Sequence, residues 1–270
     1  MRPSLFLRIL SIESRRQMSY RADFWINAVL GFAAELTIAY CLWAAIFRAS
    51  GSATLGGFTF DGMLLYYVAA ILIGKLVRGQ ERELSVARDI YEGSLNRYLI
   101  YPTVYGVFKY AEHLGSLLPA VLQAVLFGLV ASWALPLSAS SGIDAVSVAG
   151  AVVLVALANL LAFMMRFPLQ AVAFWADNVW SLNVMLRLAT EFLGGLLLPL
   201  SLFPDEVAAA LHWSPFPYLF YVPVQTLLGR VDLDQWLRSI AVMSFWCLAI
   251  GALSLWVWRR GERTYSGVGI

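Results

Sequence analysis

The sequence predicts an all-α integral membrane protein, and three observations support this fold class. Hydrophobic residues make up 60% of the 270 residues and charged residues only 13%, which is unlike the composition of soluble domains. Six apolar windows are each long enough to cross the ~30 Å hydrocarbon core of a bilayer. Five of the ten prolines fall between positions 199 and 223, in an otherwise almost wholly apolar segment. We therefore expect a single transmembrane domain, residues 1–270, with six transmembrane helices and one broken region.

The first segment, residues 1–20, is expected to form a helix that lies at the inner membrane interface. Leu5, Ile9 and Ile12 form an apolar stripe at helical spacing, while Arg8 and Arg15 fall on another face. Such a helix would turn its arginines toward anionic lipid headgroups, so membrane lipid is an expected partner. The alternative is a positively charged leader that serves only to set the topology.

The six expected spans follow from the apolar windows. They cover residues 23–47, 59–77, 104–134, 144–166, 180–203 and 236–258. With the N-terminus inside, 16 of the 19 Lys and Arg residues fall on the inner side of these spans. The positive-inside rule therefore predicts that both termini are cytoplasmic.

The longest hydrophilic stretch, residues 78–102, lies between the second and third spans. Leu84, Ala87, Ile90 and Tyr91 fall on one side of a predicted short helix, and charged residues cover the rest. An exposed Ile90–Tyr91 pair would suit the docking of a cytoplasmic partner. The alternative is a solvated loop whose charges only keep it out of the bilayer, although a connection needs fewer residues than this.

The proline cluster predicts a break in the membrane-embedded chain. A proline removes a backbone donor and disfavours a continuous helix, and every freed carbonyl in hydrocarbon needs a partner. We expect residues 204–230 to form a broken, re-entrant segment on the outer side, before the last span. The candidates for a gate there are Pro199, Pro204, Pro215, Pro217 and Pro223.

Three ionisable residues inside the expected spans are candidates for a translocation route. Glu35 lies within the first span and has no partner in its own helix, so a substrate-lining or proton-coupling role stays open. Arg187 and Glu191 are four residues apart in the fifth span. They form either a self-neutralising intrahelical pair or a polar lining of a substrate route.

Several classes of function are excluded by missing motifs. Gly74–Lys75 lacks the earlier glycine and the following hydroxyl residue of a phosphate-binding loop, so no ATP site is expected in this chain. His113 and His212 have no His or Cys partner at ligand spacing, which excludes an obvious metal site. No G-x-S-x-G motif occurs, so the sequence shows no serine nucleophile of a membrane-bound hydrolase. A net charge of +2 with scattered basic residues gives no basis for nucleic-acid binding.

Two stretches carry a resemblance to a known family. One is DIYEGSLNRYLIYP, residues 89–102, and the other runs from FWADNVWSLN through FLGGLLLPLSLFPDEV to SPFPYLFYVPVQTLLG. With the order of elements described above, they resemble a bacterial branch of the type-2 ABC exporter permeases. The resemblance implies a permease in the bacterial cytoplasmic membrane that dimerises with itself or with a related subunit.

The same resemblance implies a separate ATP-binding subunit as partner, and it places ATP and magnesium in that subunit rather than in this chain. The family's coupling helix lies between spans two and three, which points to docking residues Glu83, Asp89, Ile90, Tyr91, Glu92, Gly93 and Ser94. Two other classes compete with this expectation: an ion- or proton-coupled secondary transporter that uses Glu35, and a membrane-bound enzyme, for which no catalytic set is visible.

Overall fold

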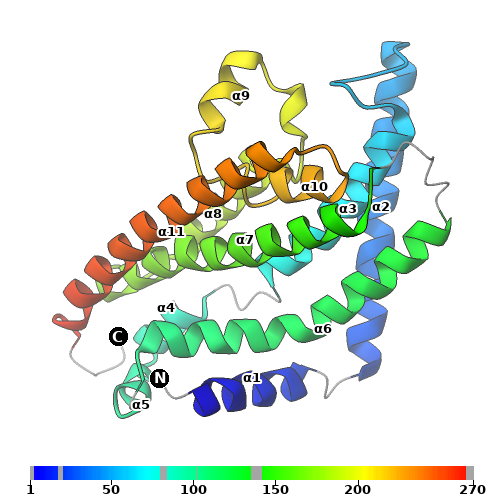
Figure 1. The fold of residues 1–270 in the computed structure, drawn as a ribbon. Helices are drawn as coiled ribbons and strands as arrows, with labels where there is room; N and C mark the ends of the chain where they lie inside the picture. Colours follow the sequence, from blue (N-terminus) through cyan, green and yellow to red (C-terminus); the bar gives the residue numbers. More distant parts are fainter. Residues whose placement is uncertain (1–2, 18–20, 80–83, 102, 135–141, 266–270) are drawn as a thin grey trace.

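A computed structural model describes residues 3–17, 21–79, 84–101, 103–134 and 142–265, and every regular element in these ranges is helical (Figure 1). The α-helices are α1 (Pro3–Gln17), α2 (Arg21–Ser50), α3 (Phe60–Arg78), α4 (Ser85–Tyr91), α5 (Leu95–Leu99), α6 (Tyr105–Ala134), α7 (Ala145–Ala171), α8 (Trp180–Leu193), α9 (Asp205–Leu211), α10 (Tyr221–Leu227) and α11 (Leu233–Glu262). Two 3₁₀ turns complete the chain, η1 (Val172–Phe174) and η2 (Leu200–Leu202).

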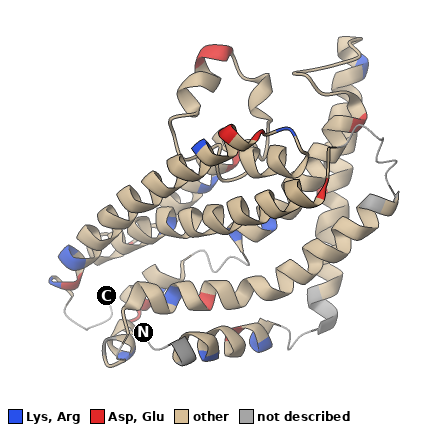
Figure 2. Cartoon of the chain, in the orientation of Figure 1, with Lys and Arg blue, Asp and Glu red and all other residues tan. Residues whose placement is uncertain are grey.

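Five of these helices are long and apolar enough to cross a membrane. They span Trp25–Ser50, Phe60–Arg78, Tyr105–Ala131, Ala145–Phe174 and Leu233–Glu262, in agreement with five of the six expected spans. Figure 2 shows few charged residues along them. Three begin at side-chain caps, because Thr59, Asp144 and Asp232 accept hydrogen bonds from backbone N–H groups that the first turn leaves unpaired.

The expected fifth span, residues 180–203, is wrong in its second half. Helix α8 has 14 residues and ends at Leu193, so it is about 21 Å long and shorter than the ~30 Å hydrocarbon core. Gly194 is its C-cap, and Gly195 follows with φ of +89°. An L-residue rarely adopts that conformation, so the helix ends at this glycine pair rather than at Pro199.

Helices α7 and α11 run side by side in the same direction. Near their starts, the Trp236 indole N–H donates to the Gly150 carbonyl over 3.1 Å. Near their ends, the Ser254 hydroxyl donates to the Met164 carbonyl over 3.4 Å. Because the two helices are parallel, residues 172–232 must bring the chain back from one end of the bundle to the other.

Helix α3 lies at the centre of the molecule and packs against α2, α6, α7 and α10. Its buried residues include Met63, Tyr66 and Val77, which belong to the main hydrophobic core. Helix α2 is the opposite case, since most of its apolar surface is exposed. Figure 1 places α1, α4, α5 and the two ends of the chain at the same end of the bundle.

Helix α1 confirms a helix in the first segment, and the face that it packs against the protein includes Glu13 and Ser14. It packs along α6, where an added Cβ on Gly115 would lie 2.7 Å from the Leu10 carbonyl oxygen. Glu13 and Ser14 are buried in this contact, whereas Ile12 is 67% exposed. Close approach at a glycine therefore decides the packed face, and Ile12 points away from it.

Candidate functional sites at the two ends of the bundle

Helix α4 turns its apolar side into the protein. Val86, Ala87 and Ile90 are buried in a second hydrophobic cluster with residues of α6, α7 and η1, among them Tyr105 and Phe167. The expectation of an exposed Ile90 is wrong, since its side chain is only 1% exposed. A short helix has too few backbone bonds to be stable alone, so burial of this side holds α4 in place.

Two polar contacts add to this attachment of α4. The Gln170 side-chain oxygen, on α7, accepts a hydrogen bond from the Val86 backbone N–H over 2.9 Å. The Tyr91 hydroxyl donates to the Ala176 carbonyl over 2.9 Å. Desolvation by burial raises the pKa of Tyr91, and the phenol is the donor in this bond at neutral pH.

Asp89 is the centre of a buried network rather than an exposed contact. The Lys109 ammonium lies 2.7 Å from one carboxylate oxygen of Asp89, and the Tyr105 hydroxyl donates to the same oxygen over 2.7 Å. The Ser94 hydroxyl donates to the other oxygen over 3.0 Å. Lys109 also lies 3.0 Å from a carboxylate oxygen of Glu112. The α4–α5 segment is thereby joined to α6 by ionic and hydrogen bonds in a partly dehydrated site, where such bonds are strong.

The network continues through aromatic rings to the last helix. The Tyr105 and Trp258 rings stack with centroids 4.6 Å apart and planes 10° from parallel. Lys109 lies 4.7 Å from the centroid of the Tyr98 ring, which belongs to α5. These contacts pack α5 against α6, and α6 against α11.

The outward side of α4 and α5 is charged and exposed. The Arg88 guanidinium lies 4.0 Å from the Glu92 carboxylate, with side chains 69% and 64% exposed. Asn96 and Arg97 are exposed on α5. Gly93 has φ of +68° and makes the sharp turn between the two helices.

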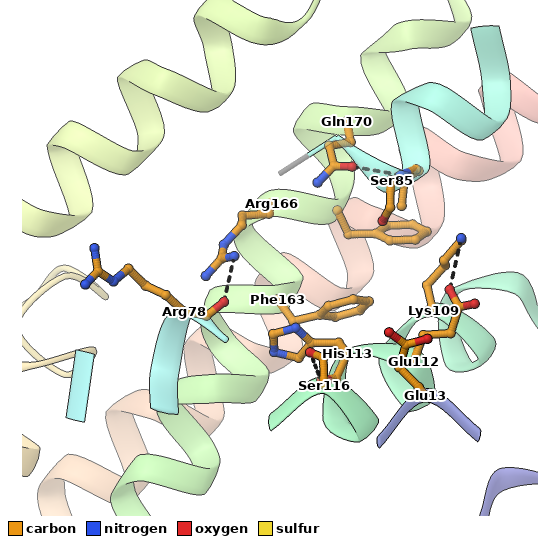
Figure 3. A pocket seen from close by; sticks show the side chains of 12 residues that line it. Glu13, Arg78, Ser85, Lys109, Glu112, His113, Ser116, Phe163, Arg166 and Gln170 are labelled. Atoms are coloured by element: carbon orange, nitrogen blue, oxygen red, sulfur yellow. Dashed lines mark hydrogen bonds and ion pairs between the residues drawn. The ribbon is translucent and has the colours of Figure 1, made fainter. Parts of the chain in front are cut away.

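A charged pocket lies beside α4, between α1, α6 and α7 (Figure 3). Its volume is about 70 Å³, which is room for a few water molecules. Lining side chains include Glu13, Lys109, Glu112, His113 and Arg166. In Figure 3, Arg166 donates to the Arg78 carbonyl over 3.1 Å. The pocket thus brings Glu13 of α1 close to Lys109 and Gln170, the residues of α6 and α7 that bind α4.

The expected contact between Arg187 and Glu191 is present, but Glu191 makes a shorter ion pair with a third residue, Arg78. The Arg78 guanidinium lies 2.6 Å from the Glu191 carboxylate, whereas Arg187 lies 4.0 Å from the same oxygen. Glu191 is buried. The strong ion pair therefore ties α3 to α8, and the intrahelical contact is secondary.

The broken segment after α8 has its backbone carbonyls satisfied from α3. The Tyr66 hydroxyl donates to the Gly195 carbonyl over 2.5 Å, and the Tyr67 hydroxyl donates to the Leu197 carbonyl over 2.6 Å. The Tyr221 backbone N–H donates to the Gly194 carbonyl over 2.9 Å. These bonds meet the requirement that broken backbone at membrane depth be paired inside the protein.

The prolines of this segment stand at the starts of short helices and in turns. Pro199 and Pro204 directly precede η2 and α9, and Pro223 lies in the first turn of α10, where a proline is tolerated. Pro215 and Pro217 lie in the turn between α9 and α10. Helix α10 is buried against α3 and α7, whereas α9 has no buried residue. The segment is thus an exposed hairpin followed by an embedded helix.

Glu35 lies on an exposed face of α2, close enough to Lys75 of α3 for an electrostatic interaction. The Lys75 ammonium lies 5.8 Å and 5.7 Å from the ring centroids of Phe32 and Phe127. The carboxylate of Glu35 therefore has a cationic neighbour on another helix.

Comparison with known protein families identifies the group to which this architecture belongs. The family model described as ABC-2 family transporter protein matches residues 33–269, which is most of the chain. The chain belongs to the ABC-2 transporter family. Among curated proteins, none matches this ABC-2 family member. Membership makes it a multi-pass membrane protein and a component of membrane transport, and permeases of this family generally work with a separate ATP-binding subunit.

The predicted docking residues of this ABC-2 protein divide into two groups. Asp89, Ile90 and Tyr91 point into the protein and anchor α4, while Glu92 is exposed. Ser94 donates to Asp89 from the turn after Gly93. Glu83 lies outside the described residues.

Sequence reasoning missed several residues that the fold of this ABC-2 protein brings together. The sequence analysis assigns no partner to Lys109 or Arg78, although an ionisable residue within or at the end of a span usually has one. Tyr66 and Tyr67 are two adjacent phenols in an apolar span, and a buried phenol usually needs a hydrogen-bond partner. No feature of the sequence pointed to Gln170 as a partner of α4.

Proposed function

We propose that this chain is the membrane-spanning subunit of an ATP-driven exporter, in which a separate ATPase docks on the outward side of α4 and α5. Family membership is the observation that carries this proposal. It agrees with the form of α4, a short helix with an anchored apolar side and an exposed charged side. ATP and magnesium would bind to the partner subunit.

Arg88 and Glu92 are the best candidates for direct contact with the ATPase. Both side chains are exposed and point away from the cluster that buries Ile90. Surface charges at such a contact give specificity and steer association more than they raise affinity. The buried residues Asp89 and Ile90 would position this pair instead of touching the partner.

Movement of the docked ATPase would reach the spans through the anchors of α4. Asp89 connects it to Lys109 and Tyr105 of α6, and Gln170 connects it to α7. Closure of two ATPases in a dimer of permeases would then shift α6, α7 and α11 as rigid bodies, which is a common form of switching. Substrate would move outward along the interface between the permease subunits.

The broken segment would serve as the outer gate of this exporter in the bacterial cytoplasmic membrane. With α8, it would supply the return crossing that parallel α7 and α11 require, and six crossings would leave both termini cytoplasmic. Its 3₁₀ turn η2 lies against the loop between α2 and α3, since an added Cβ on Gly56 would lie 2.6 Å from Leu202 Cδ2. That contact places η2 at the end opposite α4.

The docking surface is tested by exchanging its charges. Glu92→Arg is expected to reduce recovery of the ATPase about tenfold in a pulldown from mild detergent, because it places like charges beside Arg88 and against the partner. The double variant Arg88→Glu, Glu92→Arg keeps the pair within α4 but reverses its direction, and it should also fail to recover the ATPase.

A matched control lies at the other end of the bundle. Arg238 and Asp234 form an exposed i,i+4 ion pair on α11, and Asp234→Arg with Arg238→Glu should leave ATPase recovery unchanged. Full recovery with the reversed α4 pair would move the docking site elsewhere. Failure to recover any ATPase with the unmodified chain, in several detergents, would contradict the proposed function itself.

A further inference from the structure

Two opposite charges inside the membrane-capable helices, Lys75 of α3 and Glu35 of α2, lie near each other without forming an ion pair. They are close enough for an electrostatic interaction. Within the described part of the chain, however, neither side chain makes a hydrogen bond or an ion pair with another residue. The ammonium donors and the carboxylate oxygens are therefore unused, although an unmatched charge at membrane depth is costly.

Two stacked phenylalanine rings lie beside the ammonium of Lys75. Phe32 of α2 and Phe127 of α6 have ring centroids 4.9 Å apart and planes 17° from parallel. The Lys75 ammonium lies 5.8 Å and 5.7 Å from these two centroids, near the ~6 Å limit at which a ring attracts a cation. These weak contacts place the ammonium where α2, α3 and α6 meet, and they leave its N–H groups open to an anion.

Glu35 lies at the same meeting point of the helices. It follows Phe32 by three residues on α2, so the two side chains are neighbours on one side of that helix. Glu35 is exposed, whereas Lys75 is half-buried. A molecule in the surrounding lipid can therefore reach the carboxylate directly and the ammonium beside it.

Apolar side chains continue from this point along α2 and α6. Ile38 and Leu42 follow Glu35 at helical spacing on α2, and Val130 follows Phe127 on α6. All three are exposed. A headgroup beside Lys75 and Glu35 would thus have its hydrocarbon chain next to apolar surface, so each part of an amphiphile would meet its own kind of surface.

We propose that Lys75 and Glu35 bind the zwitterionic headgroup of an amphiphile, with its phosphate at Lys75, its ammonium at Glu35 and its hydrocarbon chain along α2 and α6. Each protein charge then has an opposite charge, as ions away from water require. A purely anionic headgroup would face the like charge of Glu35, and a purely cationic one would face that of Lys75. Charge complementarity therefore favours a zwitterion.

The site deepens the proposed transport function, on which it rests for placing Lys75 toward the inner leaflet. The amphiphile is either a membrane phospholipid or a transported cargo with the same headgroup chemistry.

The test measures binding of short-chain phosphatidylethanolamine to the delipidated full-length protein in neutral detergent. Three comparison ligands with matched parts are phosphatidylglycerol, which lacks the ammonium, diacylglycerol, which lacks both charges, and glycerophosphoethanolamine, which lacks the chains. Phosphatidylethanolamine is expected to bind about tenfold more tightly than phosphatidylglycerol, because the latter leaves Glu35 without a cation. The other two ligands should bind more weakly still.

One variant at each charge separates the two halves of the headgroup. Glu35→Gln removes only the negative charge, so phosphatidylethanolamine and phosphatidylglycerol should bind to it equally. Lys75→Gln should weaken both phospholipids about tenfold, since it removes the phosphate's cation. Asp234→Asn and Arg238→Gln are matched controls from an exposed acid and base of α11, and each should bind like wild type.

A preference for phosphatidylethanolamine that survives in folded Glu35→Gln would overturn the proposal, and this result is expected if a second copy of the chain covers Glu35. Unchanged affinity in folded Lys75→Gln would overturn it too. Equal binding of diacylglycerol or of glycerophosphoethanolamine would show that the chains alone, or a soluble zwitterion, is recognised, and would also overturn it. The unfolding temperature of each variant without ligand reports whether it has folded.

These measurements need no ATPase, so their failure leaves the proposed function standing, and failure to recover an ATPase would leave this site standing. The source of the amphiphile is distinguished in vesicles that contain the permease and its ATPase. A cargo would pass to the opposite leaflet during ATP turnover, and Lys75→Gln would slow that movement. A resident phospholipid would stay bound to the protein, as native mass spectrometry before and after turnover would show.

Discussion

Two buried or half-buried ion pairs at the α4 end of this bundle join different elements of the chain. Lys109 of α6 pairs with Asp89 of α4, and Arg78 of α3 pairs with Glu191 of α8. An ionised group away from water is costly unless it is matched by an opposite charge and hydrogen bonds. Such pairs therefore specify which helices lie together, and breaking one leaves an uncompensated charge.

The Asp89–Lys109 pair gives a prediction at this scale. Lys109→Met is expected to lower the free energy of unfolding by about 3 kcal/mol, because it leaves the buried Asp89 carboxylate without its cation. The measurement is thermal unfolding of the purified protein in detergent.

The double variant Asp89→Asn, Lys109→Met serves as the control for this prediction. It removes both charges and should recover a large part of the lost stability. If the double variant is less stable than Lys109→Met by the full effect of Asp89→Asn, the two residues act independently and the pairing has no energetic role.

At the scale of the element, the end of α8 shows how a membrane protein maintains a broken helix. Gly195 adopts φ of +89°, and an added Cβ there would lie 2.8 Å from Tyr221 Cβ and 3.1 Å from the Tyr66 hydroxyl oxygen. The exposed carbonyls are paired with tyrosine hydroxyls of α3. Proline alone does not break a helix here, since α6 and α7 continue through Pro119 and Pro168.

The tyrosine–carbonyl bonds give a prediction at this second scale. Tyr66→Phe is expected to cost about 1–3 kcal/mol of unfolding free energy, because it leaves the buried Gly195 carbonyl without its donor. Gly195→Ala should also destabilise the protein, through the strained backbone and the contact with Tyr221.

Thermal unfolding in detergent measures both effects on the broken segment. Tyr40→Phe, at a half-exposed position of α2, is the matched control and should unfold like wild type. Identical stability of Tyr66→Phe and Tyr40→Phe would mean that the Gly195 carbonyl does not depend on α3.

At the scale of the whole molecule, parallel packing of α7 and α11 decides the path of the chain. The segment between them returns through α8, the glycine turn, η2 and α10, and the glycine turn is packed against α3. No single helix makes this return. Five helices are long and apolar enough to cross a membrane. In addition, residues 172–232 take the chain from the end of α7 to the opposite end of the bundle, where α11 begins.

Cysteine labelling tests this topology in intact cells. In a background with Cys41→Ser and Cys247→Ala, a cysteine at Glu206 of α9 should react with a membrane-impermeant reagent added outside. A cysteine at Thr264, just after α11, should react only after the membrane is opened, because the six proposed crossings would place it in the cytoplasm. Both positions are exposed in the structure. Labelling of the two positions from the same side would exclude the sixth crossing.

The sequence by itself determined the class of this protein, five of its spans and the presence of a break before the last span. Apolar windows of sufficient length have few alternatives to transmembrane helices, and a cluster of prolines and glycines in one such window forbids a single helix. The residues 89–102 and the proline-rich stretch also led to the family that the family model then matched.

Only the tertiary structure decided which side of α4 is exposed, where α8 ends and which charges are paired. An amphipathic pattern shows that a helix has two sides, but whether its apolar side meets protein, lipid or partner depends on neighbours far away in sequence. Ile90 is buried because α6, α7 and η1 lie there, and Glu191 pairs with Arg78 because α3 passes beside α8. Long-range contacts of this kind arise from packing of the whole bundle, which no local pattern of residues encodes.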